Sequence, residues 1–533
     1  MPTENISFKK TGYFSSLICD YIQDSETLQP FYNQYPKLDN FKYQIVEKQK
    51  SFNQQARNIL VDSLMEQYSN IEISKSSIEH IQSLKEENTF TITTGHQLNI
   101  FTGPLYFLYK IVSAINLAKT LKESYPDYNF VPVYWMATED HDFEEINYFN
   151  FKGKKVRWHR NASGAVGELS TNGLDEVFDL FSKDLGIGNN ADVLRKLFSD
   201  AYLKHNNLTD ATRFLTNELF ADYGLVIIDG NDRALKKSFA PFIKDELMYG
   251  RSFKTVSKTN EKINDLPNDY KIQVNPREIN LFYLNKNVRE RIVFENETFS
   301  VLNTDISWSK DDILIELEEH PEHFSPNVIM RPLYQEVILP NLCYIGGGGE
   351  LAYWFQLKDF FNDVNVPFPI LLLRNSVLIQ TNNQEKKLRN LNVSKEDIFL
   401  KRNAFINKKV REISNIEIDF SSQKEHLTKQ FKDLYELAER TDVTFLGAVK
   451  AQEVKQLNGI DNLEKRLLKA QKRKLKDQVL RMTDLQNELF PNQSLQERNT
   501  NFSEFYLEYG ERLIPELIQN LNPLSAEFLI LTL

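Results

Sequence analysis

Two apolar, strand-like runs between residues 93 and 147 each end in a short polar segment that contains a histidine. The first ends in the Gly-His-Gln turn at 95–97, and the second, at 131–136, ends just before the Glu-Asp-His-Asp segment at 139–142. The intervening residues have the apolar spacing of a long amphipathic helix, so the pattern is β-α-β. Ligands of parallel α/β sheets bind at the carboxyl ends of the strands. The sequence therefore predicts that both histidine segments lie at one edge of a sheet.

Composition limits the classes of protein to consider. The chain has 533 residues, enough for roughly three or four domains, and a formal net charge of -10. An acidic chain disfavours a nucleic-acid partner, and no window has the ~20 consecutive apolar residues that span a bilayer. Only two cysteines occur, Cys19 and Cys343, and no signal peptide is recognisable. We expect a cytoplasmic protein without a nucleic-acid or membrane partner.

The pattern along the chain predicts an α/β protein with an interrupted parallel-sheet core. Residues 1–152 should form N-terminal helices, with apolar residues at helical spacing over 43–68, and the first part of the core. Residues 153–322 differ in character and are interpreted as a connective insertion that includes the apolar run at 224–229. The second part of the core should follow at 323–380.

The C-terminal part should be mostly helical. Glycine becomes rare after about residue 381, and Leu468, Leu475, Met482 and Leu489 recur at heptad spacing on a strongly basic stretch. This spacing is typical of a coiled-coil hairpin, predicted over 381–490, whose basic face is most simply a solvated surface. The apolar end of residues 491–533 should dock on the core.

The first histidine segment is a candidate catalytic turn. His96 could donate a hydrogen bond to a developing negative charge, and Gln97 could orient a substrate. The simpler alternative is an ordinary turn with a satisfied histidine. Gly103 and Pro104 open the following helix, whose free N–H groups could bind an anion. Asn99 and Tyr106 would then help to shape a substrate pocket.

The second histidine segment combines acids with an imidazole. Asp140, His141 and Asp142 could transfer protons, since a carboxylate beside histidine fixes its tautomer and raises its pKa. Glu139 would contact substrate. The alternative is a helix N-terminus, where acids are favoured. A metal site using His96, Asp140 and His141 is disfavoured because the chain lacks H-E-x-x-H and paired C-x-x-C motifs, so no metal is expected.

A third candidate segment is the run of four glycines at 346–349, which lies between an apolar run and a helix. It lacks the pattern of a phosphate-binding loop, and the alternative is a flexible connector. Arginine suits carboxylate binding, which makes two arginines candidates here. The proposed binding residues are Arg331, Tyr334, Gln335, Gly347, Gly348, Glu350, Tyr353, Trp354 and Arg374.

Three long blocks resemble the bacillithiol synthase family, the cysteine-adding enzymes of bacillithiol biosynthesis. They read TGHQLNIFTGPLYFLYK, VPVYWMATEDHDFEEIN and SPNVIMRPLYQEVILPNLCYIGGGGELAYWFQLK, the last followed by PFPILLLRNS. The resemblance implies a Rossmann-type core interrupted by connective insertions, and a helical coiled coil that mediates homodimerisation. It also implies a ligase that joins L-cysteine to glucosaminyl malate.

That core is in turn similar to class I aminoacyl-tRNA synthetases, whose first motif is H-x-G-H. The corresponding turn here has Gly95 and His96 but Thr93 in place of the leading histidine, and no convincing KMSKS-like motif occurs. A segment at 255–259 resembles that motif by chance, within the predicted insertion. These departures argue against direct adenylate chemistry.

Three hypotheses follow. In the first, an amide-forming ligase uses His96 and the helix start at Gly103 to stabilise negative charge, while Asp140, His141 and Asp142 transfer protons. A free carboxylate is a poor electrophile, so ATP is a candidate activating co-substrate, although no bound cofactor is expected. The second is an aminoacyl- or nucleotidyl-transfer enzyme with another acceptor. The third is a non-catalytic scaffold assembled through the coiled coil.

Overall fold

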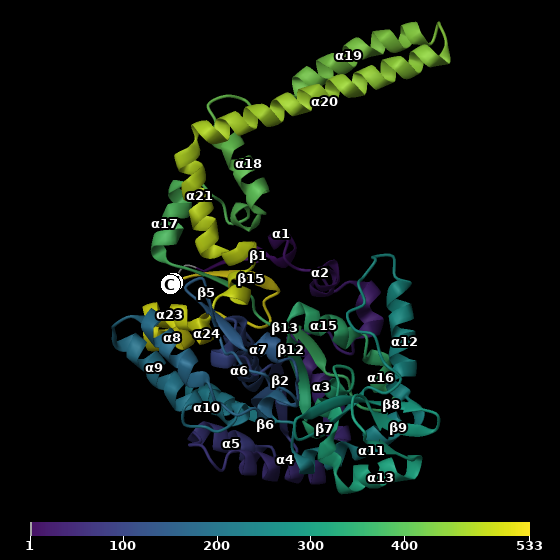
Figure 1. Ribbon diagram of the computed structural model, residues 1–533, viewed down its shortest axis with the longest axis vertical. Helices are drawn as coiled ribbons and strands as arrows, with labels where there is room; N and C mark the ends of the chain where they lie inside the picture. The colour runs from purple at the N-terminus through teal and green to yellow at the C-terminus, as the bar shows by residue number, and fades with distance from the viewer. Residues whose placement is uncertain (1–2) are drawn as a thin grey trace.

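The computed structural model describes residues 3–533, and its core is a parallel sheet of five strands (Figure 1). The strand order is β13-β12-β2-β3-β6, and every neighbouring pair is parallel. The strands are β2 (Thr89–His96), β3 (Asn129–Met136), β6 (Val226–Asp229), β12 (Asn341–Gly346) and β13 (Ile370–Leu373). Their side chains are almost all buried, as expected for a sheet covered on both faces. The predicted Rossmann-type α/β core is confirmed.

The order of the strands places a topological switch point between β2 and β12. From β2 the chain runs to β3 and β6 on one side, and it later returns to β12 and β13 on the other. Loops that leave two such strands in opposite directions open a crevice at their carboxyl ends. The first histidine turn and the glycine run leave the sheet at this crevice.

Helices from the N-terminal half cover the sheet. The crossover helix α6 (Tyr106–Ser124) packs on β2 and β3, and α3 (Phe41–Ser51) packs on β12. The helical spacing over 43–68 is divided between α3 and α4 (Gln54–Gln67), because Asn53 caps the second helix by accepting from the Ala56 N–H. The other helices of this half are α1 (Phe8–Thr11), α2 (Ser16–Ile22), α5 (Lys75–Ser83) and α7 (Phe143–Ile146).

The region predicted as an insertion is partly integrated into the core, because β6 pairs with β3 in the parallel sheet. This edge strand has three buried apolar residues and ends in Asp229. A hairpin of β4 (Tyr148–Phe151) and β5 (Lys154–Arg157) leads into the region. Its helices are α8 (Leu174–Leu185), α9 (Asn189–Tyr202), α10 (Leu208–Phe220), α11 (Arg233–Tyr249), α12 (Arg251–Asn264) and α13 (Lys310–Glu319).

A second, antiparallel sheet forms one wall beside the crevice. The strand order of this sheet is β10-β9-β8-β7-β11. Its strands are β7 (Leu281–Asn285), β8 (Val288–Glu295), β9 (Thr298–Val301), β10 (Ser307–Trp308) and β11 (Phe324–Pro326). The chain then re-enters the core through α14 (Met330–Ile338), α15 (Gly348–Phe355) and α16 (Lys358–Asp363).

A helical hairpin projects far from the core (Figure 1). It consists of α19 (Ser421–Ala438) and α20 (Val443–Lys474), which pack against each other through Phe431, Ala438 and Val449. The predicted coiled coil is confirmed, but the predicted heptad seam is not the hairpin seam. The helix breaks at Leu475, and Leu468, Met482 and Leu489 instead belong to the main core cluster. The remaining helices here are α17 (Asn382–Asn390), α18 (Arg402–Ile413) and α21 (Lys476–Leu489).

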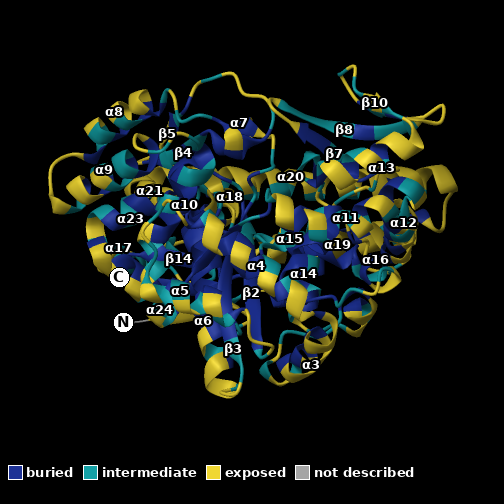
Figure 2. Cartoon of the chain, turned by 90° about the horizontal axis from the view of Figure 1, so that it is seen from below, coloured by how far each residue is buried: buried dark blue, intermediate teal, exposed yellow. Residues whose placement is uncertain are grey.

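The C-terminal segment returns to the body of the protein. β15 (Glu527–Thr532) lies between β1 (Thr3–Ser7) and β14 (Val377–Gln380), and its last five residues are buried. The predicted docking is thus observed, through α22 (Gln496–Asn499), α23 (Phe502–Tyr509) and α24 (Leu513–Asn520). Burial is concentrated in the sheet strands β2 and β3 (Figure 2). Across residues 3–533, no helix combines the length and apolarity required to cross a bilayer.

Candidate functional site

A cavity of about 680 Å³ lies at the carboxyl ends of β2, β3 and β12. The antiparallel sheet contributes its other wall through β7, β8 and β11. Nine of the predicted site residues line it, drawn from both histidine segments and from the helices on either side of the glycine run. They are His96, Gln97, Tyr106, Glu139, Asp140, His141, Arg331, Glu350 and Tyr353. The structure thus brings the three candidate segments to one cleft.

Two further predicted residues lie beside this cavity. Asn99 and Gly103 line a smaller hollow of about 330 Å³, which shares Gln97, Tyr106 and Glu145 with the main cavity. Gly103 has a φ of 62°, and a Cβ there would lie 2.5 Å from the Asn99 Cβ, so this turn requires glycine. The Leu105 N–H donates to the Thr500 carbonyl at 2.8 Å. That donor is therefore not free to bind an anion, as the sequence analysis had assumed for this helix start.

The other predicted residues do not line the cavity. Asp142 is exposed and its side chain caps no helix. Tyr334 and Trp354 are buried packing residues, with the Tyr334 hydroxyl donating to the Gly230 carbonyl at 2.7 Å. Gly347 and Gly348 form the backbone start of α15, and Gln335 and Arg374 lie behind the cavity wall. Their predicted contact with substrate is not supported by these positions.

Arg374 has a protein partner in place of the predicted carboxylate ligand. Its guanidinium donates to Glu497 at 2.8 Å, and both side chains are buried. Glu497 also accepts from the Val377 N–H at 3.1 Å. The pair therefore joins the end of the parallel sheet to the C-terminal segment. Sequence spacing could not reveal this contact, because the two residues are 123 positions apart.

His96 is held as a neutral imidazole. The ring packs against Tyr106 and Phe107, with centroids 5.4 and 5.2 Å away. Burial lowers its pKa well below the usual value, and the nearby cations Lys110 and Arg374 add to this effect. Its Nε2 is buried and has no hydrogen-bond partner among residues 3–533. A neutral imidazole with one unsatisfied nitrogen can serve a ligand in the cavity as donor or acceptor.

A buried lysine, absent from the sequence prediction, organises the floor of the cavity. Lys110 donates to the Gly95 carbonyl at 2.6 Å and to Glu350 Oε1 at 2.5 Å. Glu350 Oε2 accepts from the Tyr344 hydroxyl at 2.8 Å. The lysine therefore ties the first histidine turn to the helix that follows the glycine run. The available signal was the position of Lys110 within the apolar helix pattern of 105–121.

The second histidine is oriented by an arginine and not by its neighbouring aspartate. His141 Nδ1 accepts from the Arg289 guanidinium at 2.6 Å, whereas Asp140 Oδ1 is 3.8 Å away. Asp140 instead accepts from the His141 N–H at 2.7 Å and from Gln97 at 2.8 Å. The prediction that a carboxylate fixes this tautomer is wrong. Since Nδ1 accepts, the proton of the neutral ring is on Nε2.

Four arginines line the cavity, and the sequence analysis identified only one of them, Arg331. Arg289 and Arg291 come from β8 of the antiparallel wall, Arg277 from the segment that precedes β7, and Arg331 from α14. Within the described residues, none of the four forms an ion pair with a carboxylate. Arg289 and Arg291 alternate along β8 and so share one face, a spacing visible in the sequence. A group of arginines that form no ion pair within the protein is suited to an anionic ligand, although Glu139 and Asp140 lie near Arg289.

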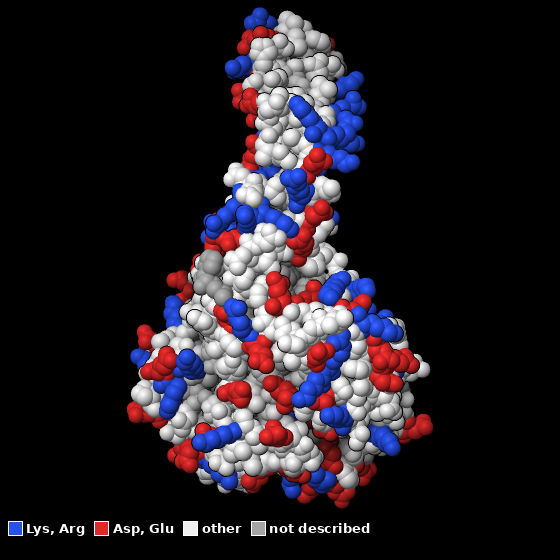
Figure 3. All heavy atoms as spheres, turned by 90° about the vertical axis from the view of Figure 1, so that its left-hand side faces the viewer, with Lys and Arg blue, Asp and Glu red and all other residues white. Residues whose placement is uncertain are grey.

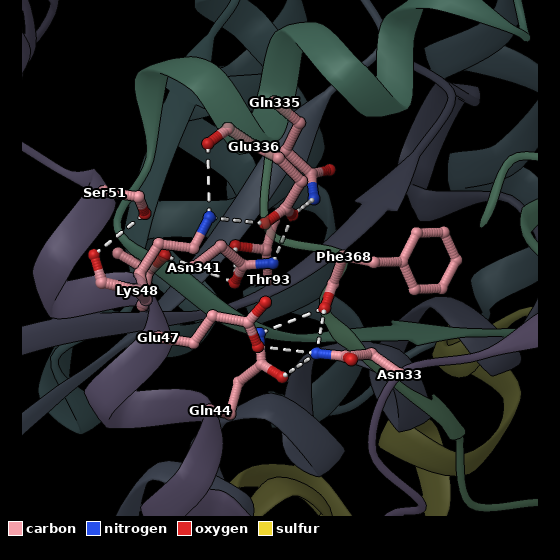
Figure 4. A network of polar contacts seen from close by, with 11 residues as sticks. Asn33, Gln44, Glu47, Lys48, Ser51, Thr93, Gln335, Glu336, Asn341 and Phe368 are labelled. Atoms are coloured by element: carbon pink, nitrogen blue, oxygen red, sulfur yellow. Dashed lines mark hydrogen bonds and ion pairs between the residues drawn. The ribbon is translucent and has the colours of Figure 1, made fainter. Parts of the chain in front are cut away.

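Arg331 donates to Gln335, which belongs to a buried network with Lys48, Glu336, Asn341 and Thr93 (Figure 4). Its Nη1 donates to Gln335 Oε1 at 3.0 Å, and Gln335 Nε2 donates to Glu336 Oε1 at 3.0 Å. Glu336 forms an ion pair with Lys48 at 3.0 Å, and both side chains are essentially inaccessible. A carboxylate only accepts, so it must face the amide NH₂ of Gln335 and turn the amide oxygen towards Arg331. The network therefore fixes the orientation of the guanidinium.

The same network reaches the sheet strands. Asn341 donates to Glu336 Oε1 at 2.6 Å and accepts from the Thr93 hydroxyl at 2.8 Å. Thr93 lies on β2, three residues before His96. The orientation of Arg331 is thereby linked to the strand that presents the first histidine.

The fold and the cleft together define a class: a Rossmann-like α/β protein with a polar, arginine-lined cleft at its topological switch point and a helical coiled-coil extension. The family "Bacillithiol biosynthesis BshC, N-terminal Rossmann-like domain" matches residues 1–375, and the corresponding "C-terminal coiled-coil domain" matches residues 377–533. The chain belongs to this BshC family of bacillithiol biosynthesis.

Relatives along the whole length agree with this assignment. The chain is 61% identical to a Flavobacterium johnsoniae protein over all of both chains. It is 38% identical to a Cytophaga hutchinsonii protein, with 98% of this chain and 97% of that one covered. A Bacillus cereus protein is 28% identical, with 98% of each covered. All three bear the name "Putative cysteine ligase BshC".

Proposed function

We propose that this protein is a ligase that joins the carboxyl group of L-cysteine to the amine of glucosaminyl malate, forming the amide of bacillithiol. The observation that carries the proposal is the group of four cavity arginines without carboxylate partners, opposite His96 and Asp140. Malate has two carboxylates, and bidentate guanidinium contacts are the usual means of holding them. The names of the relatives supply the cysteine and the ligase reaction.

We assign different roles to the cavity arginines according to the wall from which they come. Arg289 and Arg291 share one face of β8, and we assign them with Arg277 to the malate carboxylates. Arg331 approaches from the opposite wall and is already oriented by Gln335. Its guanidinium is assigned to a carboxylate or to the carbonyl oxygen under attack. Tyr106 and Tyr353 would contact the sugar between these charged ends.

The reaction forms one C–N bond and breaks one C–O bond. The amine nitrogen attacks the carboxyl carbon of an activated cysteine, the activating group leaves with the C–O electron pair, and the amine loses a proton. We assign that proton to Asp140, which lines the cavity beside His141. Neutral His96 would donate a hydrogen bond to the oxygen that becomes negative. ATP is the proposed source of the activating group.

The projecting hairpin is proposed as a homodimer contact. Several of its apolar side chains are substantially exposed, among them Leu437 at 52% and Val443 at 84%. A second copy of the hairpin would cover such side chains and add helices to a thin two-helix layer. The two cysteines are free and buried, which suits the reducing cytoplasm where we propose the protein acts.

The activity test combines purified protein with L-cysteine, glucosaminyl malate and ATP, and detects the thiol product by mass spectrometry. We expect product formation that requires all three components. Absence of the product, together with unchanged cellular thiols in a deletion strain, would contradict the proposal. Amino-acid-dependent pyrophosphate exchange with a residue other than cysteine would instead favour a transfer enzyme with another acceptor.

A further inference from the structure

A second cluster of ligand-type side chains lies outside the cavity, in the turn between α13 and β11. His320, Glu322 and His323 each offer one ligand atom, and these atoms all lie within 4.8 Å of one another. The two imidazole rings stack with centroids 4.9 Å apart. All three side chains are only partly buried, so an ion from solvent could reach them.

His323 is oriented as a metal ligand would be. Its Nδ1 lies 2.7 Å from Glu316 Oε1, which also accepts from the Tyr283 hydroxyl at 2.7 Å. A carboxylate only accepts, so Nδ1 carries the proton and Nε2 keeps its lone pair. A carboxylate on the far nitrogen of a histidine is the usual outer partner of a metal-binding imidazole. The Tyr283 hydroxyl, 3.1 Å from Nδ1, adds to the same support.

Glu322 has one occupied and one unoccupied oxygen. Its Oε1 accepts from Arg233 at 2.9 Å and lies 3.3 Å from His320 Nδ1. Its Oε2 is buried and has no hydrogen-bond partner within residues 3–533. A buried carboxylate oxygen without a partner is unfavourable. A cation bound beside the two imidazoles would satisfy it.

We propose that His320, Glu322 and His323 bind a divalent transition metal, with Zn²⁺ as the expected ion. Two imidazoles and one carboxylate suit zinc, while Ca²⁺ and Mg²⁺ prefer oxygen ligands alone. Zinc bonds of about 2.0–2.2 Å require the three ligand atoms to draw closer. The partly exposed rings can make that adjustment by side-chain rotation. The fourth position would hold water.

The site is linked to the cavity through one lysine. Lys236 donates to the Glu322 carbonyl at 2.9 Å and pairs with Glu139, which lines the cavity. A metal that fixes the turn at 320–323 would therefore also fix the partner of Glu139. The spacing H-x-E-H matches neither of the motifs considered in the sequence, which explains why the sequence indicated no metal.

The test is Zn²⁺ titration of the chelator-treated full chain by calorimetry, with Co²⁺ absorption as a second measurement. We expect one tight site per chain, weakened at least tenfold in His323→Ala and in His320→Asn. Glu316→Gln should weaken binding roughly 10- to 100-fold through the outer partner. Circular dichroism of each variant shows whether it retains the fold.

Two histidine variants serve as controls. His426→Ala removes an exposed histidine of the hairpin, and His141→Ala removes the cavity histidine. Both should bind Zn²⁺ as the unaltered chain does. The proposal is overturned if the unaltered chain binds no Zn²⁺, if folded His320→Asn and His323→Ala variants bind it equally well, or if either control abolishes binding.

Discussion

The cleft and the projecting hairpin use charge in opposite ways. Behind and beneath the cleft, charged side chains are buried in pairs, as in Lys48–Glu336, Arg374–Glu497 and Lys110–Glu350. On the hairpin, charges lie at the surface, and Lys and Arg side chains gather along one edge of the projecting part (Figure 3). Buried pairs cost desolvation and are weak evidence for stability alone. Their concentration behind the cavity indicates that they fix the geometry of the cleft.

The largest expected effect comes from breaking the pair behind Arg331. Lys48→Met leaves Glu336 buried without its counter-charge, which should reduce the free energy of unfolding by about 3–5 kcal/mol. Burial already raises the pKa of Glu336, and loss of Lys48 removes the main opposing influence. Denaturant unfolding followed by circular dichroism measures the loss.

A matched double variant sharpens this result. Lys48→Met combined with Glu336→Gln removes both charges and should recover most of the lost stability. If Lys48→Met is as stable as the original chain, the Lys48–Glu336 pair does not hold the residues behind the cleft in place.

The second effect concerns binding at the cleft. Arg331→Met removes charge-assisted hydrogen bonds worth about 1.5–3 kcal/mol, so the KM for glucosaminyl malate should rise roughly 10- to 100-fold. Arg331→Lys keeps the charge but loses the planar fork and should fall in between. Steady-state kinetics and a direct titration with glucosaminyl malate provide the measurements. An unchanged KM and affinity would remove Arg331 from the substrate contacts.

The α/β core and the meeting of the histidine segments could be predicted, because both depend on local patterns. Apolar runs separated by a long helix require a parallel sheet, and the sheet places His96 and His141 at one edge. Partners distant in sequence could not be predicted. The pairing of Arg374 with Glu497, and of Arg289 with His141, depends on how separate segments pack. The heptad spacing likewise predicted a helix. It did not show which part of the protein the apolar side chains of that helix contact.

The third prediction concerns the pH dependence of stability that results from the burial of His96. Burial depresses the pKa of His96, so the folded state resists its protonation while the unfolded chain is protonated below about pH 6.5. Stability is therefore complete above that pH and falls as the pH drops towards the depressed value. Between pH 6.5 and 5.5 the loss should be about 1 kcal/mol, and at lower pH it should approach about 1.4 kcal/mol per pH unit until the depressed pKa is reached.

His96→Gln should lack this part of the pH dependence, measured as the unfolding free energy at each pH. His80 also has a pKa lowered by burial, so His80→Gln is the matched control and should remove only its own contribution. An identical pH dependence in His96→Gln and the original chain would show that His96 is not held neutral by the fold.

The smallest effect is expected on the hairpin. Lys424 contacts Asp461 at 2.5 Å and Glu464 at 3.1 Å, but it is about a third exposed, with a side-chain exposure of 31%. Solvent and salt screen such contacts, so Lys424→Ala should reduce the free energy of unfolding less than any variant above. Denaturant unfolding at low and at high salt measures it, and the small loss should shrink further at high salt. If Lys424→Ala lowered the free energy of unfolding as much as Lys48→Met, the surface charges of the hairpin would stabilise the fold as strongly as the buried charges behind the cleft. The contrast between the two regions would then be wrong.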